Sequence, residues 1–112
     1  MQNDEEIREF VSPDGVLRFQ VRSSSSDICL GFEGFPWHTH GDLLVQSSET
    51  PTAAAQRFVA MLVEGELIVA VQRVGGAIQD IWITDDPESD VRYIQLDDPI
   101  EFRRWDGTKV EV

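Results

Sequence analysis

The chain has 112 residues, 41% of them hydrophobic, which is enough for one compact domain with its own core. It carries 21 Asp and Glu against 9 Lys and Arg, a formal charge of −12. This balance argues against DNA and RNA as partners, because binding them needs clustered Lys and Arg to displace counterions. We therefore expect a single globular domain over 1–112 that binds no nucleic acid.

The chain also carries signals of its compartment. Its beginning, MQNDEEIREF, is acidic where a signal peptide would be basic and then apolar. No apolar run approaches the roughly 20 residues of a membrane helix. Cys29 is the only cysteine, so no intrachain disulfide can form, and its neighbours Ile28 and Leu30 predict a buried thiol in a strand. We expect a cytoplasmic protein that does not bind membranes.

The first predicted elements are strands. Pro, Asp and Gly at 12–15 (SPDG) favour a tight turn, and so predict a hairpin. In its second arm Leu17, Phe19 and Val21 alternate with polar residues, as a half-buried strand requires. After four serines, 28–32 predicts a third strand, and 43–45 (LLV) predicts a further short one.

A helix is predicted next. Thr50 is suited to the N-cap, Pro51 to the first helical position, and Gly65 to the end of the helix. The apolar residues at spacings of three and four are Ala54, Ala55, Phe58, Met61 and Leu62. Such a stripe is typical of a helix packed on a sheet.

From residue 66 onward the pattern predicts strands alone. The segment 67–71 is continuously apolar, as in a central strand, and GlyGly at 75–76 predicts a hairpin. The segment 85–90 (DDPESD) is interpreted as a polar connection. The other predicted strands are 77–83, 91–96, 100–105 and 108–112. The expected fold class is α+β, with a mostly antiparallel twisted sheet of about six to eight short strands and one helix on one face.

The two histidines raise the possibility of a metal site. In an extended segment His38, His40 and Asp42 would point to one side, and two His with one carboxylate suit zinc or non-haem iron. The pattern HTHGD looks like the start of the metallo-β-lactamase HxHxDH motif and, as HxH, like a cupin site. Both families need further histidines, which this chain lacks. A small metal-dependent enzyme is therefore kept as an alternative.

Other catalytic sets are incomplete. Cys29 has no predicted base beside it, and the serines are not in a nucleophile elbow. GlyGly at 75–76 lacks the lysine and the strand-to-helix context of a phosphate loop. We expect no cofactor, and a binding role rather than an enzymatic one.

The negative charge is concentrated. Between Asp80 and Glu101 eight acids face one base, Arg92, for a local charge of −7. The acids of this span are Asp80, Asp85, Asp86, Glu88, Asp90, Asp97, Asp98 and Glu101. The span is either a solvated face that keeps the protein soluble or a docking surface for a basic partner.

Aromatic residues add a second candidate contact. Trp37 beside His38 and His40 would form a contact patch, since interfaces concentrate Trp at their anchors. Alternatively, Trp37 folds onto the core and the histidines cap backbone carbonyls. Trp82 and Trp105 lie at expected strand ends in the same way.

With these elements in place, the chain resembles the small acidic α+β immunity proteins that bacteria encode beside polymorphic toxins. The segments GFPWHTH, IWITDD and RRWDG stand in that architectural context. The resemblance implies an inhibitor that pairs its carboxylates with a cationic toxin domain. The expected partner-binding residues are Trp37, His38, His40, Asp85, Asp86, Glu88 and Asp90. A homo-oligomer, for instance a homodimer joined through an unpaired strand at 108–112, is the remaining alternative.

Overall fold

The computed structural model describes residues 6–93 and 100–111. Within them seven strands and three helices form an α+β fold, which confirms the expected class and strand number. The strands are β1 (Glu6–Val11), β2 (Arg18–Ser23), β3 (Ile28–Phe32), β4 (His38–His40), β5 (Ile68–Val74), β6 (Ala77–Thr84) and β7 (Ile100–Arg103). The helices are α1 (Gly41–Leu44), α2 (Pro51–Val63) and α3 (Pro87–Tyr93).

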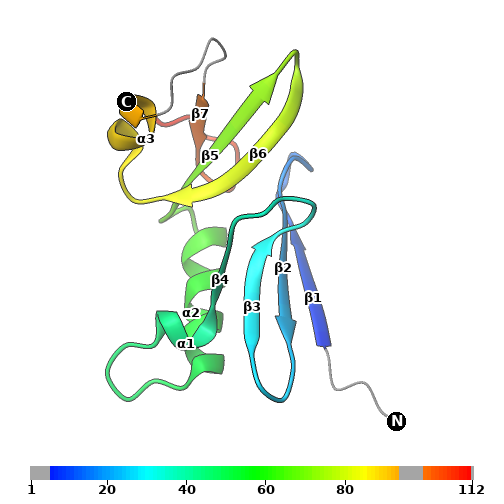
Figure 1. The fold of residues 1–112 in the computed structure, drawn as a ribbon, viewed down its shortest axis with the longest axis vertical. Helices are drawn as coiled ribbons and strands as arrows, with labels where there is room; N and C mark the ends of the chain where they lie inside the picture. The colour runs from blue at the N-terminus through cyan, green and yellow to red at the C-terminus, as the bar shows by residue number, and fades with distance from the viewer. Residues whose placement is uncertain (1–5, 94–99, 112) are drawn as a thin grey trace.

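The strands are divided between two antiparallel sheets. The N-terminal sheet has the order β1-β2-β3-β4, and the C-terminal sheet has the order β6-β5-β7. The two sheets follow one another along the long axis of the molecule (Figure 1). The radius of gyration is 15.0 Å, larger than the roughly 13 Å of a compact chain of 100 residues. The molecule is therefore elongated.

The first hairpin forms as its turn residues predict. The Ser12 hydroxyl donates to the Asp14 carboxylate at 2.6 Å and accepts from the backbone N–H of Leu17 at 3.0 Å. β1 and β2 then pair with Phe10 opposite Phe19. Leu17 and Phe19 are fully buried, so the alternation in this strand places the predicted side in the core.

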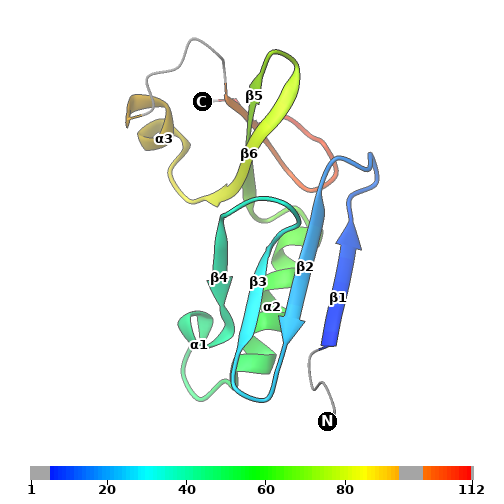
Figure 2. The same cartoon turned by 45° about the vertical axis from the view of Figure 1, so that its right-hand side comes forward.

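The predicted helix is confirmed as α2. The Thr50 hydroxyl accepts from the Ala53 N–H at 3.1 Å, Pro51 is the first helical residue, and Gly65 follows the helix end with φ of +83°. Ala54, Ala55 and Leu62 are its buried residues. Figure 2 shows the helix covering one face of the N-terminal sheet.

One hydrophobic cluster joins the two sheets. Phe19 lies at its centre, in edge contact with Phe32 at 5.1 Å between ring centroids and stacked on Phe58 at 6.2 Å. Val69 and Trp105, from the C-terminal half, belong to the same cluster. Trp105 is 4% exposed, so it is a core residue and not an exposed aromatic contact.

An ion pair also joins the halves. Arg103 of β7 is buried, and its Nη1 donates to Oδ2 of Asp14 in the first turn at 2.7 Å. Its Nη2 donates to the Trp105 carbonyl at 2.9 Å and its Nε to the Arg104 carbonyl at 3.0 Å. The hydrogen bonds from Arg103, helped by those from Ser12 and Val16, hold the pKa of Asp14 well below its usual range.

Four local predictions are wrong in whole or in part. The segment 43–45 is no strand, because the chain turns into α1 at Gly41. The expected polar connection at 85–90 contains the start of α3, and this helix also takes the first part of the strand predicted at 91–96; residues 94–96 lie outside the described residues. Cys29 lies in a strand as expected, but its thiol is only partly buried.

The end of the chain forms less structure than predicted. After the turn at Asp106 and Gly107, the described pairing of the expected strand 108–112 is one bridge between Lys109 and Arg103. Hydrogen bonds from the Arg104 N–H to the Thr108 carbonyl and from the Val110 N–H to the Phe102 carbonyl flank this bridge. No helix in the described part of the chain is long and apolar enough to cross a membrane.

Candidate functional site

The face of the N-terminal sheet turned away from α2 carries most of the reactive side chains. The registers place Cys29 opposite His40 and Gly31 opposite His38 on β3 and β4. Because successive side chains alternate between faces, this face is the one opposite to the buried Leu30 and Phe32. It is called the open face below. Its polar residues on β2 are Arg18, Gln20 and Arg22.

A hollow of about 340 Å³ lies on the open face. Its lining includes Gln20, Arg22, Asp27, Cys29, Gly31, Phe35, Trp37, His38 and His40. Gly31 is required here because a Cβ at this position would lie 2.8 Å from the Trp37 carbonyl oxygen. Glycine thus allows β4 to approach β3, and the position opposite His38 carries no side chain.

Both histidines are held through the same ring atom. Nδ1 of His38 lies 2.9 Å from the carbonyl oxygen of Pro36, and Nδ1 of His40 lies 2.9 Å from a carboxylate oxygen of Asp27. A carbonyl oxygen only accepts, so the proton of the first bond is on Nδ1 of His38. The two rings are 5.2 Å apart between centroids, at 88°.

The predicted triad of His38, His40 and Asp42 is not formed. Gly41 ends the extended segment and is buried where a Cβ would meet the Pro51 carbonyl at 2.9 Å, so Asp42 follows in α1 and lines a different hollow. The carboxylate that reaches His40 is Asp27, thirteen residues earlier. No local spacing rule relates the two, so sequence reasoning missed it. Among the residues that the structure describes, no group of three or more His, Cys, Asp or Glu is arranged to hold a metal ion.

The remaining groups of this face are also defined. Trp37 is half-buried and packs against Phe32, with ring centroids 6.1 Å apart, as in the alternative in which it folds onto the core. Burial, and then the charge of Asp27, raise the pKa of the Cys29 thiol, although Arg22 opposes them. A raised pKa keeps the sulfur protonated and unsuited to nucleophilic attack.

The predicted acidic residues lie elsewhere, at the start of α3 beside the C-terminal sheet (Figure 1). We call Asp85, Asp86, Glu88 and Asp90 the acidic turn. Asp86 caps the helix by accepting from the Ser89 N–H at 3.2 Å, and Asp90 accepts from the Trp82 indole at 3.0 Å. The side chains of Asp85 and Glu88 are exposed and form no hydrogen bond or ion pair with the side chains of residues 6–91 and 100–111. The seven predicted contact residues therefore fall on two separate surfaces.

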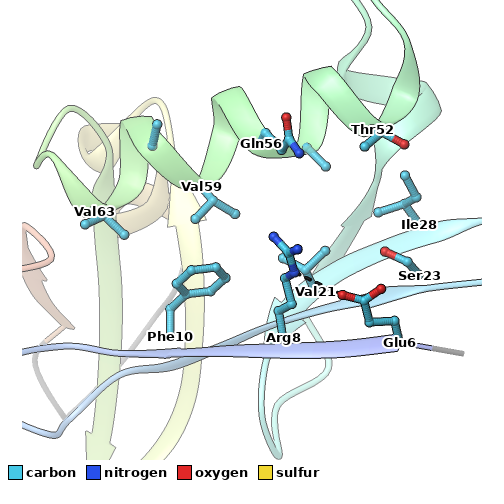
Figure 3. A pocket seen from close by; sticks show the side chains of 12 residues that line it. Glu6, Arg8, Phe10, Val21, Ser23, Ile28, Thr52, Gln56, Val59 and Val63 are labelled. Atoms are coloured by element: carbon cyan, nitrogen blue, oxygen red, sulfur yellow. Dashed lines mark hydrogen bonds and ion pairs between the residues drawn. The ribbon is translucent and has the colours of Figure 1, made fainter.

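A third feature had no counterpart in the sequence analysis. A groove of about 610 Å³ lies between α2 and the edge strand β1. Figure 3 shows Phe10 and Arg8 of β1 pointing across it toward Val59 and Val63 of α2. Its walls are mainly apolar, and Glu6 and Arg8 are the charged side chains that line it.

No protein-family model, curated protein or solved structure matches this chain.

Proposed function

We propose that this protein is a non-catalytic binding module whose partner is a basic protein, in the manner of a bacterial immunity protein that inhibits a cationic toxin domain. The acidic turn supplies the attraction. The proposal assigns the protein to the cytoplasm, and its single thiol, with no disulfide, supports a reducing compartment.

The distribution of ion pairs supports this proposal. Six of the nine Lys and Arg side chains form ion pairs with carboxylates of the described residues. These pairs are Arg8–Glu6, Arg18–Glu9, Arg57–Glu49, Arg73–Glu101, Lys109–Glu101 and Arg103–Asp14. Most of the chain's own positive charge is thus already engaged by carboxylates away from the acidic turn.

The observation that carries the proposal is the state of Asp85 and Glu88. Both are exposed, and neither side chain forms a hydrogen bond or ion pair with the side chains of residues 6–91 and 100–111. Two further carboxylates of the turn are fixed by their bonds to Ser89 and Trp82. A cationic surface would meet four carboxylates on a short, held segment, and complementary charge speeds association and selects the partner.

The test uses the product of the adjacent reading frame where that product is a basic domain. Binding should weaken steeply between low and high salt, and Asp85→Lys with Glu88→Lys should weaken it at least about tenfold, because like charges then face one another. Both substitutions leave the Asp86–Ser89 and Asp90–Trp82 hydrogen bonds in place.

The matched control is Glu64→Lys with Glu66→Lys. These two exposed residues follow α2, and the pair changes the net charge by the same amount. Binding that is insensitive to salt, or equal losses in the two double variants, would contradict recognition by the acidic turn.

A second candidate function, self-association, is favoured by β1. This edge strand pairs only with β2 among the described strands, and its Ile7 and Val11 are 51% and 44% exposed. An antiparallel pair of two β1 strands centred on Ile7 places Glu6 of each copy opposite Arg8 of the other. Opposite charges across strands stabilise such a pair by about 0.2–1 kcal/mol each.

Sedimentation velocity tests this candidate. A dimer should dissociate in Arg8→Glu and return in Glu6→Arg with Arg8→Glu, which restores the opposite charges with their positions exchanged. A protein that sediments as a monomer over the whole accessible concentration range would exclude it. This edge takes the place of the expected strand 108–112, whose described part, 108–111, forms one isolated bridge.

A further inference from the structure

His38 and His40 are arranged as a pair of ligands. The Nδ1 of each ring is engaged, by the Pro36 carbonyl and by the Asp27 carboxylate, both at 2.9 Å. With the proton on Nδ1, each Nε2 keeps a free lone pair, which is the form of histidine that binds a metal. Metal-binding histidines commonly donate their other ring N–H to a carbonyl or a carboxylate in this way.

The two acceptors lie at opposite ends of the pair. Pro36 precedes His38 along the strand, whereas Asp27 precedes β3 and so lies beyond the other end of β4, since Cys29 pairs with His40. Because the two nitrogens of an imidazole lie on different edges of the ring, neither Nε2 is used by these hydrogen bonds.

The spacing of the rings agrees with one shared ion. A zinc–nitrogen distance of about 2.0–2.1 Å with tetrahedral angles sets two imidazole centroids about 5 Å apart. The observed separation is 5.2 Å. The hollow of about 340 Å³ that both histidines line gives the ion access to solvent.

We propose that His38 and His40 bind Zn²⁺ through their Nε2 atoms, with Asp27 as the positioning residue of His40. Imidazole ligands favour zinc over calcium or magnesium, which prefer oxygen. The remaining coordination positions fall to water, since no described cluster of three ligands exists. Cys29 lies on the same face, opposite His40, and the cobalt measurement below tests whether its thiol takes part.

The experiment is a zinc titration of the metal-free full chain by calorimetry, in the absence of any partner. His38→Ala and His40→Ala should each weaken binding at least about tenfold, and Asp27→Asn should weaken it by about tenfold, as loss of a ligand's hydrogen-bond partner does. Asp42→Asn is the matched control, because it removes one carboxylate close in sequence that does not join the pair; it should change the affinity less than about twofold. Circular dichroism of each variant confirms the fold.

Cobalt replaces zinc in a second measurement. If the absorption spectrum of bound Co²⁺ contains a sulfur charge-transfer band that disappears in Cys29→Ser, the thiol is a ligand. If the spectrum of bound Co²⁺ lacks this band, the ligands are the two imidazoles and water. Zinc affinity that is unchanged in His38→Ala with His40→Ala would overturn the proposal, since the carboxylates of this acidic chain would then be the ligands. Failure of this site leaves the binding of a basic partner at the acidic turn untouched.

Discussion

The open face and the acidic turn differ in how their charges are balanced. On the open face Arg18 meets Glu9 at 2.9 Å and His40 meets Asp27 at 2.9 Å. In the acidic turn Asp85 and Glu88 form no ion pair with the basic side chains of residues 6–91 and 100–111. The net charge of −12 therefore does not by itself locate a docking surface. The proposed docking surface rests instead on the exposed carboxylates Asp85 and Glu88, whereas the charges of the open face are engaged with one another.

The halves that carry these two regions are joined by the hydrophobic cluster and by the ion pair of Asp14 with Arg103. Asp14→Ala should destabilise the protein by about 2–4 kcal/mol, because it leaves the buried guanidinium without its counter-charge; this is somewhat less than the about 3–5 kcal/mol of a fully buried pair. The Asp14 side chain is 37% exposed, which is the reason for the reduction. Urea unfolding at neutral pH measures the change.

The control for this pair is Arg18→Ala, which breaks the exposed pair with Glu9. Such surface pairs contribute about 0–1 kcal/mol. If the two variants lose the same stability, the Asp14–Arg103 pair is not the connection described here.

The same pair predicts a dependence on pH. The pKa of Asp14 is lowered in the folded state by the hydrogen bonds from Arg103, so the unfolded state binds its proton more readily. Its contribution is fully present above the unfolded value, about 4, and is lost as the pH falls below it. In Asp14→Asn, unfolding curves between pH 5 and pH 2 should therefore show a smaller loss of stability, while a loss equal to that of the parent protein would assign the acid sensitivity to other carboxylates.

A smaller effect is expected where β3 and β4 meet. Gly31→Ala should destabilise the protein by about 1–3 kcal/mol, as overpacking does, because its Cβ would meet a backbone oxygen that no rotamer change can move. Gln20→Ala, on the same open face, should cost less than about 0.5–1 kcal/mol, and thermal unfolding compares the two. A tolerated alanine at Gly31 would mean that the two strands separate freely, and the histidine pair would then not be fixed.

The smallest effects compare two helix caps built on the same plan. Thr50→Ala should cost about 1 kcal/mol, because α2 is part of the core and its start is lost with the cap. Asp86→Ala removes the equivalent bond to Ser89 from the short helix α3. It should lower amide protection in α3 by hydrogen exchange and leave global stability nearly unchanged. An equal loss of global stability in both variants would show that α3 belongs to the cooperative core.

These caps also show what could be predicted. Thr50 followed by Pro51 was interpreted as a helix start because an apolar stripe follows it. Asp86 followed by Pro87 is the same signal, yet the next residues are polar and lack that stripe, so the helix was missed. An N-cap residue followed by proline predicts the start of α3 even where no apolar stripe follows.

The sequence predicts the histidines of the candidate site but not the carboxylate that contacts them. Alternation along 38–40 correctly places both histidines on one face, and the turn residues at 12–15 and 75–76 correctly predict their hairpins. The exclusion of Asp42 follows from the close approach of Gly41 to Pro51, and the recruitment of Asp27 follows from the pairing of β3 with β4. Both are long-range packing effects that local periodicity does not encode.

The hydrogen bond between Trp82 and Asp90 places an intrinsic fluorescence probe at the acidic turn. Its donor is an indole N–H, 3.0 Å from a carboxylate oxygen that an arriving cation would also contact. Indole emission responds to such a change in its surroundings, so engagement of the turn would register as a change in intrinsic fluorescence without any attached dye. Replacing Trp37 with phenylalanine would leave the enclosed Trp105 as a steady background against which that signal is read.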